Sequence, residues 1–267
     1  LSDGTGNFDD VPVVVLIDEF SASSSEIFSG AIQDNDRGLI VGRRSFGKGL
    51  VQRSFELPDS SELRLTVQRY YTPSGRCIQK DYVRGDNEAY ESEILERYNH
   101  GENFTPDSAH IKTGELFTTV GGRTVYGGGG IMPDVFVPSD TAGVNKFYLE
   151  LANASLLNRF AFEYVDLNRS ELSKAETTDE LLDMLPSDGV LLSAFASYVK
   201  QNGVRLRYYY LNNSRRLIVR QLKALIARDV LGIQAYYEID NTDDPAVIEA
   251  VKQIKSGAAS AILPSQQ

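Results

Sequence analysis

Residues 12–34 read Pro-Val-Val-Val-Leu-Ile-Asp-Glu-Phe-Ser-Ala-Ser-Ser-Ser-Glu-Ile-Phe-Ser-Gly-Ala-Ile-Gln-Asp. The first six residues form an apolar run rich in β-branched side chains, which predicts a strand buried on both faces. From Glu26 onward the apolar residues recur with helical spacing, at Ile27, Phe28, Ala31 and Ile32. The stretch therefore predicts a strand, a serine-rich turn and a helix.

The serines lie where the predicted helix begins. A helix N-terminus has free N–H groups and the positive end of the helix dipole, and both stabilise negative charge that develops during acyl transfer. The more ordinary interpretation of this segment taken alone is structural. Ser23 and Glu26 have the Ser-x-x-Glu spacing of a capping box, and serines at helix starts are usually caps.

A second segment offers a base for such a serine. Gly38–Gly42 predicts a short buried strand, and Lys48 follows in a loop with a glycine on each side. The chain has two histidines, His100 and His110, both in a polar region, so a Ser-His-Asp site is difficult to build. A lysine normally titrates near about 10.4, so a lysine base needs apolar surroundings that disfavour its charged form. Gln52 could hold the amine in place without adding charge.

Nucleotide binding is a weaker interpretation of the same loop. Gly42 to Lys48 matches the pattern G-x-x-x-x-G-K, but Gly49 stands where a P-loop has Ser or Thr to hold magnesium. The segment that follows also predicts a strand, whereas a P-loop opens a helix. We therefore expect no nucleotide at this loop.

Taken together, four segments resemble the carboxyl-terminal processing proteases, also called tail-specific proteases, which are Ser-Lys peptidases of the S41 family. The matching residues are 14–34, 40–52, 63–80 and 130–134. The resemblance covers about the first half of the chain, and its combined motifs are specific. It implies an α/β core related to the crotonase and Clp-protease folds, of which only a part is present, and it implies no metal or cofactor.

The resemblance also implies roles for four residues. The family's nucleophile falls on Ser23, its general base on Lys48, and the glutamine that orients the lysine on Gln52. An aspartate that is important in some members falls on Asp34, for which a surface charge or turn residue is the alternative. Ser23 would attack a peptide carbonyl while Lys48 takes its proton.

Full members of the family have an upstream PDZ domain and a first half of the protease core, whose glycine-rich strand end contributes to the oxyanion hole. Residues 1–17 do not match that strand end. We therefore expect this chain to be a fragment that is inactive, or nearly so, by itself. One lost oxyanion donor typically costs about two to three orders of magnitude in rate.

The rest of the chain predicts two domains, a core over 1–140 and a helical carboxyl-terminal domain over 141–267. Within the core, Leu50–Leu57 and Glu62–Tyr71 predict a pair of strands with one buried and one wet face, and residues 81–115 predict a partly irregular insertion. The helical pattern covers Val144–Tyr164, Ser170–Leu185, Gly189–Asn202, Ser214–Leu231 and Pro245–Ser256. This domain could wrap the core or form a homodimer interface.

Composition limits the partners. The net charge of −10 argues against nucleic acid, and no apolar run reaches 18 residues, so no membrane span is expected. The single cysteine, Cys77, excludes an internal disulfide. The resemblance implies protein or peptide substrates with unstructured carboxyl termini, in the bacterial cell envelope, either periplasmic or lipid-anchored. The main alternative is a non-catalytic binding module on the same fold. An acyl-CoA enzyme is disfavoured because Lys48 and Gln52 would then have no role.

Overall fold

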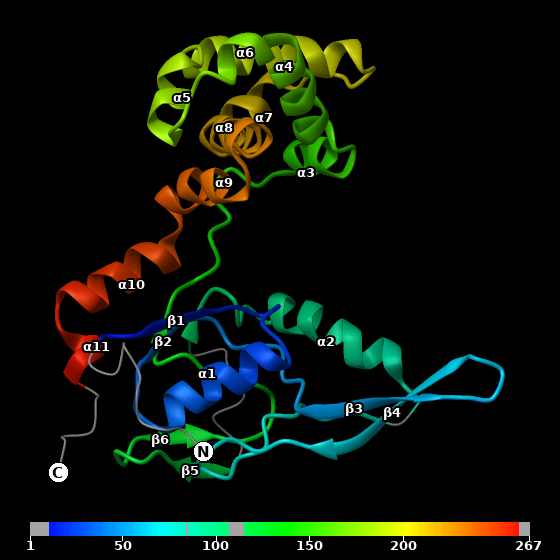
Figure 1. Ribbon diagram of the computed structural model, residues 1–267, viewed down its shortest axis with the longest axis vertical. Helices are drawn as coiled ribbons and strands as arrows, with labels where there is room; N and C mark the ends of the chain where they lie inside the picture. Colours follow the sequence, from blue (N-terminus) through cyan, green and yellow to red (C-terminus); the bar gives the residue numbers. More distant parts are fainter. Residues whose placement is uncertain (1–10, 84, 107–114, 262–267) are drawn as a thin grey trace. The chain divides into compact units, whose positions relative to one another are not determined.

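The computed structural model describes residues 11–83, 85–106 and 115–261, which form two compact units (Figure 1). The first unit is a mixed α/β structure that contains the chain up to Ser139 and from Pro245 onward, and the second, Asp140–Asp244, is helical. The predicted α/β core and helical region are therefore confirmed. The chain from Pro245 onward, however, returns to the first unit instead of completing a helical domain over 141–267. His110 and part of the predicted insertion lie outside the described residues.

A three-stranded parallel sheet forms the centre of the first unit. Its strands are β1 (Val14–Ile17), β2 (Leu39–Gly42) and β7 (Val135–Phe136), in the order β1-β2-β7. The central strand β2 is buried throughout, as Gly38–Gly42 predicts. The expectation that the first strand is buried on both faces is wrong, because β1 lies at the edge of this sheet and Leu16 is exposed.

Alternation along the strands gives the sheet two apolar faces. On one face Ile17 and Ile40 pack with Ile78, Ile131 and, from helix α1 (Ser24–Asp34), Ile32. On the other face the strand side chains pack against alanines of α10 (Pro245–Lys255) and α11 (Ala258–Ala261). Helices from both ends of the chain thus enclose the sheet, and α1 begins directly after the edge strand.

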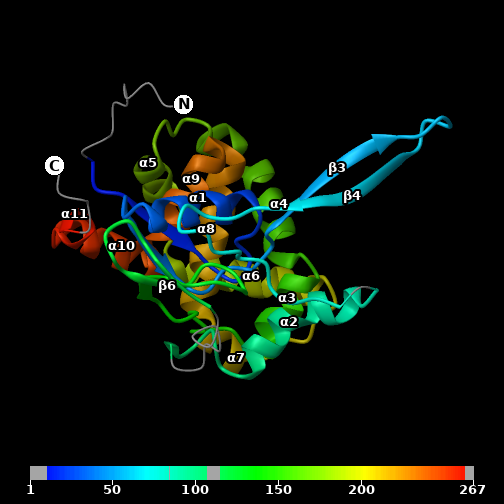
Figure 2. The same cartoon turned by 90° about the horizontal axis from the view of Figure 1, so that it is seen from below.

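The hairpin of β3 (Leu50–Glu56) and β4 (Glu62–Arg69) extends away from the rest of its unit in both views (Figures 1 and 2). The predicted pairing is confirmed, with Phe55 opposite Leu63 and a register shift at Val51/Gln52. The predicted buried face is wrong, since Leu63 is 44% and Leu65 46% exposed. Within the described ranges, every residue of β4 is exposed.

Two further elements complete the first unit. The region predicted as an irregular insertion contains the helix α2 (Asn87–Asn99), which Asp86 caps by accepting the N–H of Ala89 at 2.9 Å. The short strands β5 (Leu116–Thr118) and β6 (Thr124–Tyr126) pair antiparallel.

The second unit has one continuous apolar core. Its elements are α3 (Lys146–Asn153), α4 (Leu156–Leu172), α5 (Thr178–Met184), α6 (Asp188–Gln201), α7 (Tyr208–Asn213), α8 (Arg215–Leu231), α9 (Ile233–Asp240) and the 3₁₀ turn η3 (Asn241–Asp243). Helix α8, predicted as Ser214–Leu231, contributes buried residues at helical spacing, including Ile218, Leu222 and Ile226. In the part of the chain with described structure, no helix has the length and apolar character that crossing a bilayer requires.

Two details of the helical unit differ from the sequence prediction. The predicted helix Val144–Tyr164 is two helices, because Ser155 takes a left-handed conformation (φ 54°) between α3 and α4. The helices α7 and α9 were not predicted. Both are short, and short helices depend on tertiary packing more than on their own pattern.

Replacing Leu222 by alanine should lower the free energy of unfolding by about 2–5 kcal/mol, because it leaves a cavity in the core of the helical unit. Urea denaturation followed by circular dichroism measures this loss. Leu167→Ala on α4 is the control, since that side chain is 85% exposed and should change stability by less than about 0.5 kcal/mol. Equal losses in the two variants would contradict the packing of α8 at the centre of this unit.

Candidate active site

Ser23 lies in the turn between β1 and α1, at the N-cap of the helix. Its backbone has φ 55° and ψ −114°, a conformation that is rare for a residue other than glycine. Strained backbone of this kind persists only where the surroundings hold it, and it is concentrated at functional sites. The N–H of Ser24, the first helical residue, has no acceptor among the described residues. The turn thus offers a half-buried serine beside a free N–H group.

The carboxylate of Glu26 is fully buried and accepts four hydrogen bonds. One comes from the N–H of Ser23 at 3.0 Å, which completes the predicted capping box. The other three come from the loop that contains Lys48: the hydroxyl of Ser45 at 2.5 Å and the N–H groups of Gly47 at 2.7 Å and Lys48 at 2.8 Å. One side chain therefore joins the backbone of the predicted nucleophile to that of the predicted base.

We call residues 43–49 the base loop, and most of its backbone polar groups are paired. The N–H of Ser45 donates to the carbonyl of Ile131 at 3.0 Å, and the N–H of Phe46 donates to the carbonyl of Ser21 at 2.9 Å. The N–H of Gly49 donates to Oε1 of Gln79 at 2.9 Å. Gly47, at φ 91°, takes a conformation that favours glycine. A loop with so many partners has a defined geometry instead of many alternatives.

Tyr70, at the end of β4, forms a second link between the two segments. Its hydroxyl lies 3.0 Å from the carbonyl oxygen of Ser23 and also donates to the carbonyl of Lys48. Burial, together with the nearby charge of Glu26, raises the pKa of Tyr70 well above its ordinary value. The hydroxyl therefore keeps its proton and remains a hydrogen-bond donor at any physiological pH.

The sequence predicts that the side chains of Ser23, Lys48 and Gln52 act together, but they do not contact one another through hydrogen bonds in the structure. Across the described residues, no hydrogen bond links Ser23 Oγ, Lys48 Nζ and the Gln52 amide to one another, and the ammonium of Lys48 has no hydrogen bond or ion pair. Lys48 is half-buried, whereas Gln52 is exposed on β3 beside the register shift. The structure brings the backbones of Ser23 and Lys48 together but does not place Gln52 against the lysine.

Asp34 lies at the other end of α1 and is fully buried, so the surface alternative for this residue is wrong. It forms an ion pair with Arg76 at 2.7 Å and accepts hydrogen bonds from the hydroxyl and N–H of Ser74 at 2.6 and 3.1 Å. Burial by itself would raise the pKa of Asp34, but the charge of Arg76 and the Ser74 hydrogen bonds hold it below the ordinary 3.8. It lies eleven positions after Ser23 in the sequence, a distance of about 16 Å along the helix axis.

A polar network surrounds this end of the helix. Arg76 also donates to the side chain of Gln33 at 2.7 Å, and Gln33 donates to Asp134, in the Gly-Ile-Met-Pro-Asp segment, at 2.9 Å. Asp134 accepts the N–H of Ile40 on the central strand at 2.8 Å. Asp34 and its neighbours therefore anchor α1 to the sheet, far from the turn that holds Ser23.

Sequence reasoning missed several of these residues. The sequence predicts Glu26 only as the second residue of a capping box with Ser23. The Ser-x-x-Glu spacing does place a carboxylate at this turn, but it does not indicate that the carboxylate is buried. Tyr70 and Ser45 gave no signal, because their partners are distant in the chain and backbone contacts leave no spacing pattern. Arg76 also gave no signal in the sequence, yet its side chain is fully buried.

Comparison with known proteins gives two family matches. Residues 2–89 match the model of peptidase family S41, and residues 147–232 match DUF8443, a family of unknown function. The chain is 51% identical over 71 residues to a carboxyl-terminal-processing protease of Picosynechococcus sp., and the match covers 27% of this chain and 17% of that protein. It is 46% identical over 85 residues to a chloroplastic C-terminal processing peptidase of Tetradesmus obliquus, with 32% and 18% covered.

Two further similarities are of the same kind. A carboxy-terminal-processing protease of Bartonella bacilliformis is 54% identical over 71 residues, with 27% of this chain and 16% of that protein covered. A solved structure, a photosystem II D1 C-terminal processing protease, is 29% identical, with 49% of this chain and 22% of that chain covered and a TM-score of 0.29. The chain thus matches less than a fifth of the length of these curated relatives.

Replacing Glu26 by glutamine should lower the free energy of unfolding by about 3 kcal/mol or more, because the amide group turns a donor toward groups that are themselves donors. Chemical denaturation measures the loss. Glu88→Gln, an exposed position on α2, serves as the matched control and should be near neutral. A neutral Glu26→Gln variant would mean that the carboxylate does not hold the two segments together.

Asp34 should make stability depend on pH in acid. Because its pKa is lower in the folded state, its contribution is fully present above about 3.8, the ordinary value, and is lost as the pH falls through the folded value. Asp34→Asn should therefore be much less stable than the parent at pH 7, and the difference should narrow below about pH 3.8. Urea titrations at pH 7 and pH 3 measure both values. A difference that stays constant with pH would contradict the ion pair with Arg76.

Proposed function

We propose that residues 2–89, which match the model of peptidase family S41, are part of a serine endopeptidase of the Ser-Lys type. Ser23 is the nucleophile and Lys48 the general base. The observation that supports this assignment best is the Glu26 carboxylate, which binds the N–H groups of both residues. Tyr70 supports it independently, through the carbonyl groups of the same two residues.

In the proposed reaction, the hydroxyl of Ser23 attacks a peptide carbonyl while neutral Lys48 takes its proton. Lys48 then returns the proton to the leaving amine, and water repeats the cycle on the acyl-enzyme. The free N–H of Ser24 points to one donor for the oxyanion, because it belongs to the residue after the nucleophile and lies at the positive end of α1. Lys48 has no competing partner among the described residues, which leaves its amine available for this role.

Gln52 orients Lys48 in this proposal, and Asp34 contributes by anchoring α1. The exposed hairpin position of Gln52 requires a movement of the Lys48 side chain, of Gln52, or of both before they meet. Catalytic hydrogen bonds are often long or absent without substrate, so the separation is compatible with a resting site.

The substrates we propose are proteins cut near unstructured carboxyl-terminal tails. Support comes from the relatives, whose names describe carboxyl-terminal processing and which occur in bacteria and in chloroplasts. We also propose a bacterial cell-envelope location, periplasmic or lipid-anchored. Because the match covers less than a fifth of their length, we also propose that efficient cleavage requires further segments that complete the oxyanion hole and bind the tail.

The central test compares variants of the intact protein in cleavage of an unstructured carboxyl-terminal peptide. Ser23→Ala and Lys48→Ala should each lower the rate by about a thousandfold or more, since each removes a group that acts in bond breaking. Ser25→Ala is the matched control, because Ser25 is an exposed neighbour in the same serine cluster, and it should cleave at the parental rate.

Labelling with a fluorophosphonate probe gives a second readout of the nucleophile. The parent and Ser25→Ala should label and Ser23→Ala should not. Cleavage by Ser23→Ala at the parental rate would refute the assignment. A parent that binds the peptide but neither cleaves it nor labels would instead favour the alternative, a non-catalytic binding module on the same fold.

A further inference from the structure

The base loop is held from a second side, by a helix that the family match hardly includes. The S41 match ends at residue 89, whereas α2 runs from Asn87 to Asn99. From the last turn of α2, the guanidinium of Arg97 donates to the carbonyl of Arg44 at 2.8 Å and to that of Ser45 at 3.0 Å. Arg97 is only 4% exposed. One fork of donors therefore fixes two consecutive carbonyl groups of the loop.

Two carboxylates, the buried Glu102 and the half-buried Glu93, balance the charge of this contact. Glu102, also 4% exposed, accepts from Arg97 Nε at 3.1 Å and from Arg44 Nε at 2.5 Å. Glu93, on α2, pairs with Arg44 at 3.2 Å and with Lys80 at 3.0 Å, and lies 4.0 Å from Arg97. Burial lowers the pKa of Arg97, and Arg44 lowers it further, while Glu102 and Glu93 oppose the shift. Removing one partner would leave the others buried and unpaired, which is costly.

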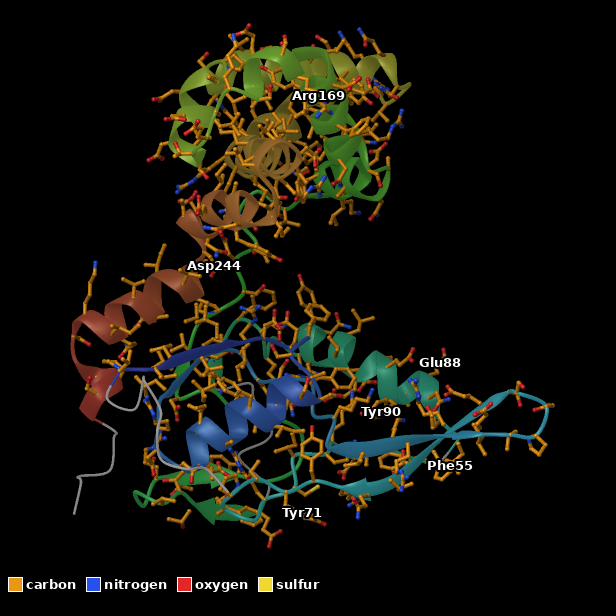
Figure 3. All side chains as sticks on the ribbon, in the orientation of Figure 1. Phe55, Tyr71, Glu88, Tyr90, Arg169 and Asp244 are labelled. Carbon is orange, nitrogen blue, oxygen red and sulfur yellow. The ribbon has the colours of Figure 1, made fainter. Side chains whose placement is uncertain are left out.

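Lys80 continues the contact to the residues next to Lys48. Its ammonium lies 4.0 Å from the ring centre of Phe46 and 4.2 Å from that of Tyr90, which is labelled on α2 in Figure 3. The ammonium also donates to the carbonyl of Tyr90 at 2.7 Å, and the backbone N–H of Lys80 donates to the carbonyl of Gly47 at 2.9 Å. Lys80 thus contacts Phe46 and Gly47 of the base loop as well as Tyr90 of α2.

We propose that α2 is a positioning element for the catalytic lysine and that Arg97 is its principal positioning residue. Glu26 binds the base loop from the side of α1, and Arg97 binds it from the side of α2. The loop can present Lys48 to Ser23 in one geometry only while both contacts are made. Arg97 touches neither Lys48 nor Ser23 in this arrangement, so it acts through the loop. The proposal rests on the function proposed above and adds to it a residue that lies beyond the S41 match.

The test measures amide hydrogen exchange at Gly47 and Lys48 by NMR in the full chain. These N–H groups donate to the Glu26 carboxylate, so their exchange rates and chemical shifts report the loop geometry directly. Arg97→Gln should speed exchange at both amides by about tenfold or more, because the loop loses two charge-assisted hydrogen bonds. Arg97→Lys should give a smaller effect, since an ammonium cannot fork to two carbonyls in the same way.

Arg76→Gln is the matched control. Arg76 is also buried and ion-paired in the same unit, but its partner Asp34 lies at the far end of α1. The Arg76→Gln variant should leave the exchange rates at Gly47 and Lys48 within about twofold of the parent, compared at the same global stability. Unchanged exchange in Arg97→Gln, or equal acceleration in Arg76→Gln, would overturn the proposal.

Kinetics of the intact protein add a readout that a purely structural role would not move. Arg97→Gln should lower kcat by about tenfold with KM within about twofold, because Arg97 affects the base and not substrate binding. A rise in KM at constant kcat would overturn the positioning role. If the parental intact protein does not cleave the peptide, the proposed peptidase is wrong. The exchange measurement on this chain does not require turnover, so it tests the loop assignment separately.

Discussion

The first unit depends on one buried carboxylate. Glu26 sits on the first turn of α1, and its two oxygens accept hydrogen bonds from the turn before the helix and from a loop about twenty residues later. An unpaired charge in that position would be expensive, so the two segments must both be in place for the unit to be stable. The same interaction that stabilises the fold therefore also sets the separation of Ser23 and Lys48. The candidate site therefore forms when the first unit folds.

This constraint explains why α1 buries a mainly polar face, whereas its apolar spacing predicts that Ile27 and Phe28 face the core. The buried residues of the helix are Glu26, Ser29, Gly30, Gln33 and Asp34, whereas Ile27 and Phe28 are exposed. Polar contacts hold both ends of the helix, with Glu26 at one end and the Asp34–Arg76 pair at the other. Ile32 alone reaches the apolar core beneath the sheet. A helix that faces inward with polar groups needs specific partners for each of them, and the structure supplies those partners from four separate segments.

Sequence reasoning predicted the elements of the fold better than their surroundings. The strand–turn–helix start, the buried strand β2, the β3–β4 pairing and the amphipathic stripe of α8 all follow from local periodicity. The predictions were wrong where they stated which face of an element other elements cover. The alternating residues of β4 predict a buried face, yet none of the described elements covers it, and Leu16 is exposed because β1 is an edge strand. Alternation predicts that two faces differ but not what packs against either one.

The sequence by itself determined the local chemistry: a serine at a helix N-terminus, a lysine between two glycines, and a resemblance that assigned them roles. Only the tertiary structure decided that Glu26 and Tyr70 join those two residues, that Asp34 is a buried anchor, and that α10 returns to the sheet. The reason is physical. Periodicity and spacing record which neighbours along the chain share a face, whereas a hydrogen bond between a side chain and a distant backbone group places no requirement on the sequence at the backbone end. Contacts of that kind build this site, so they became visible only when the chain was folded.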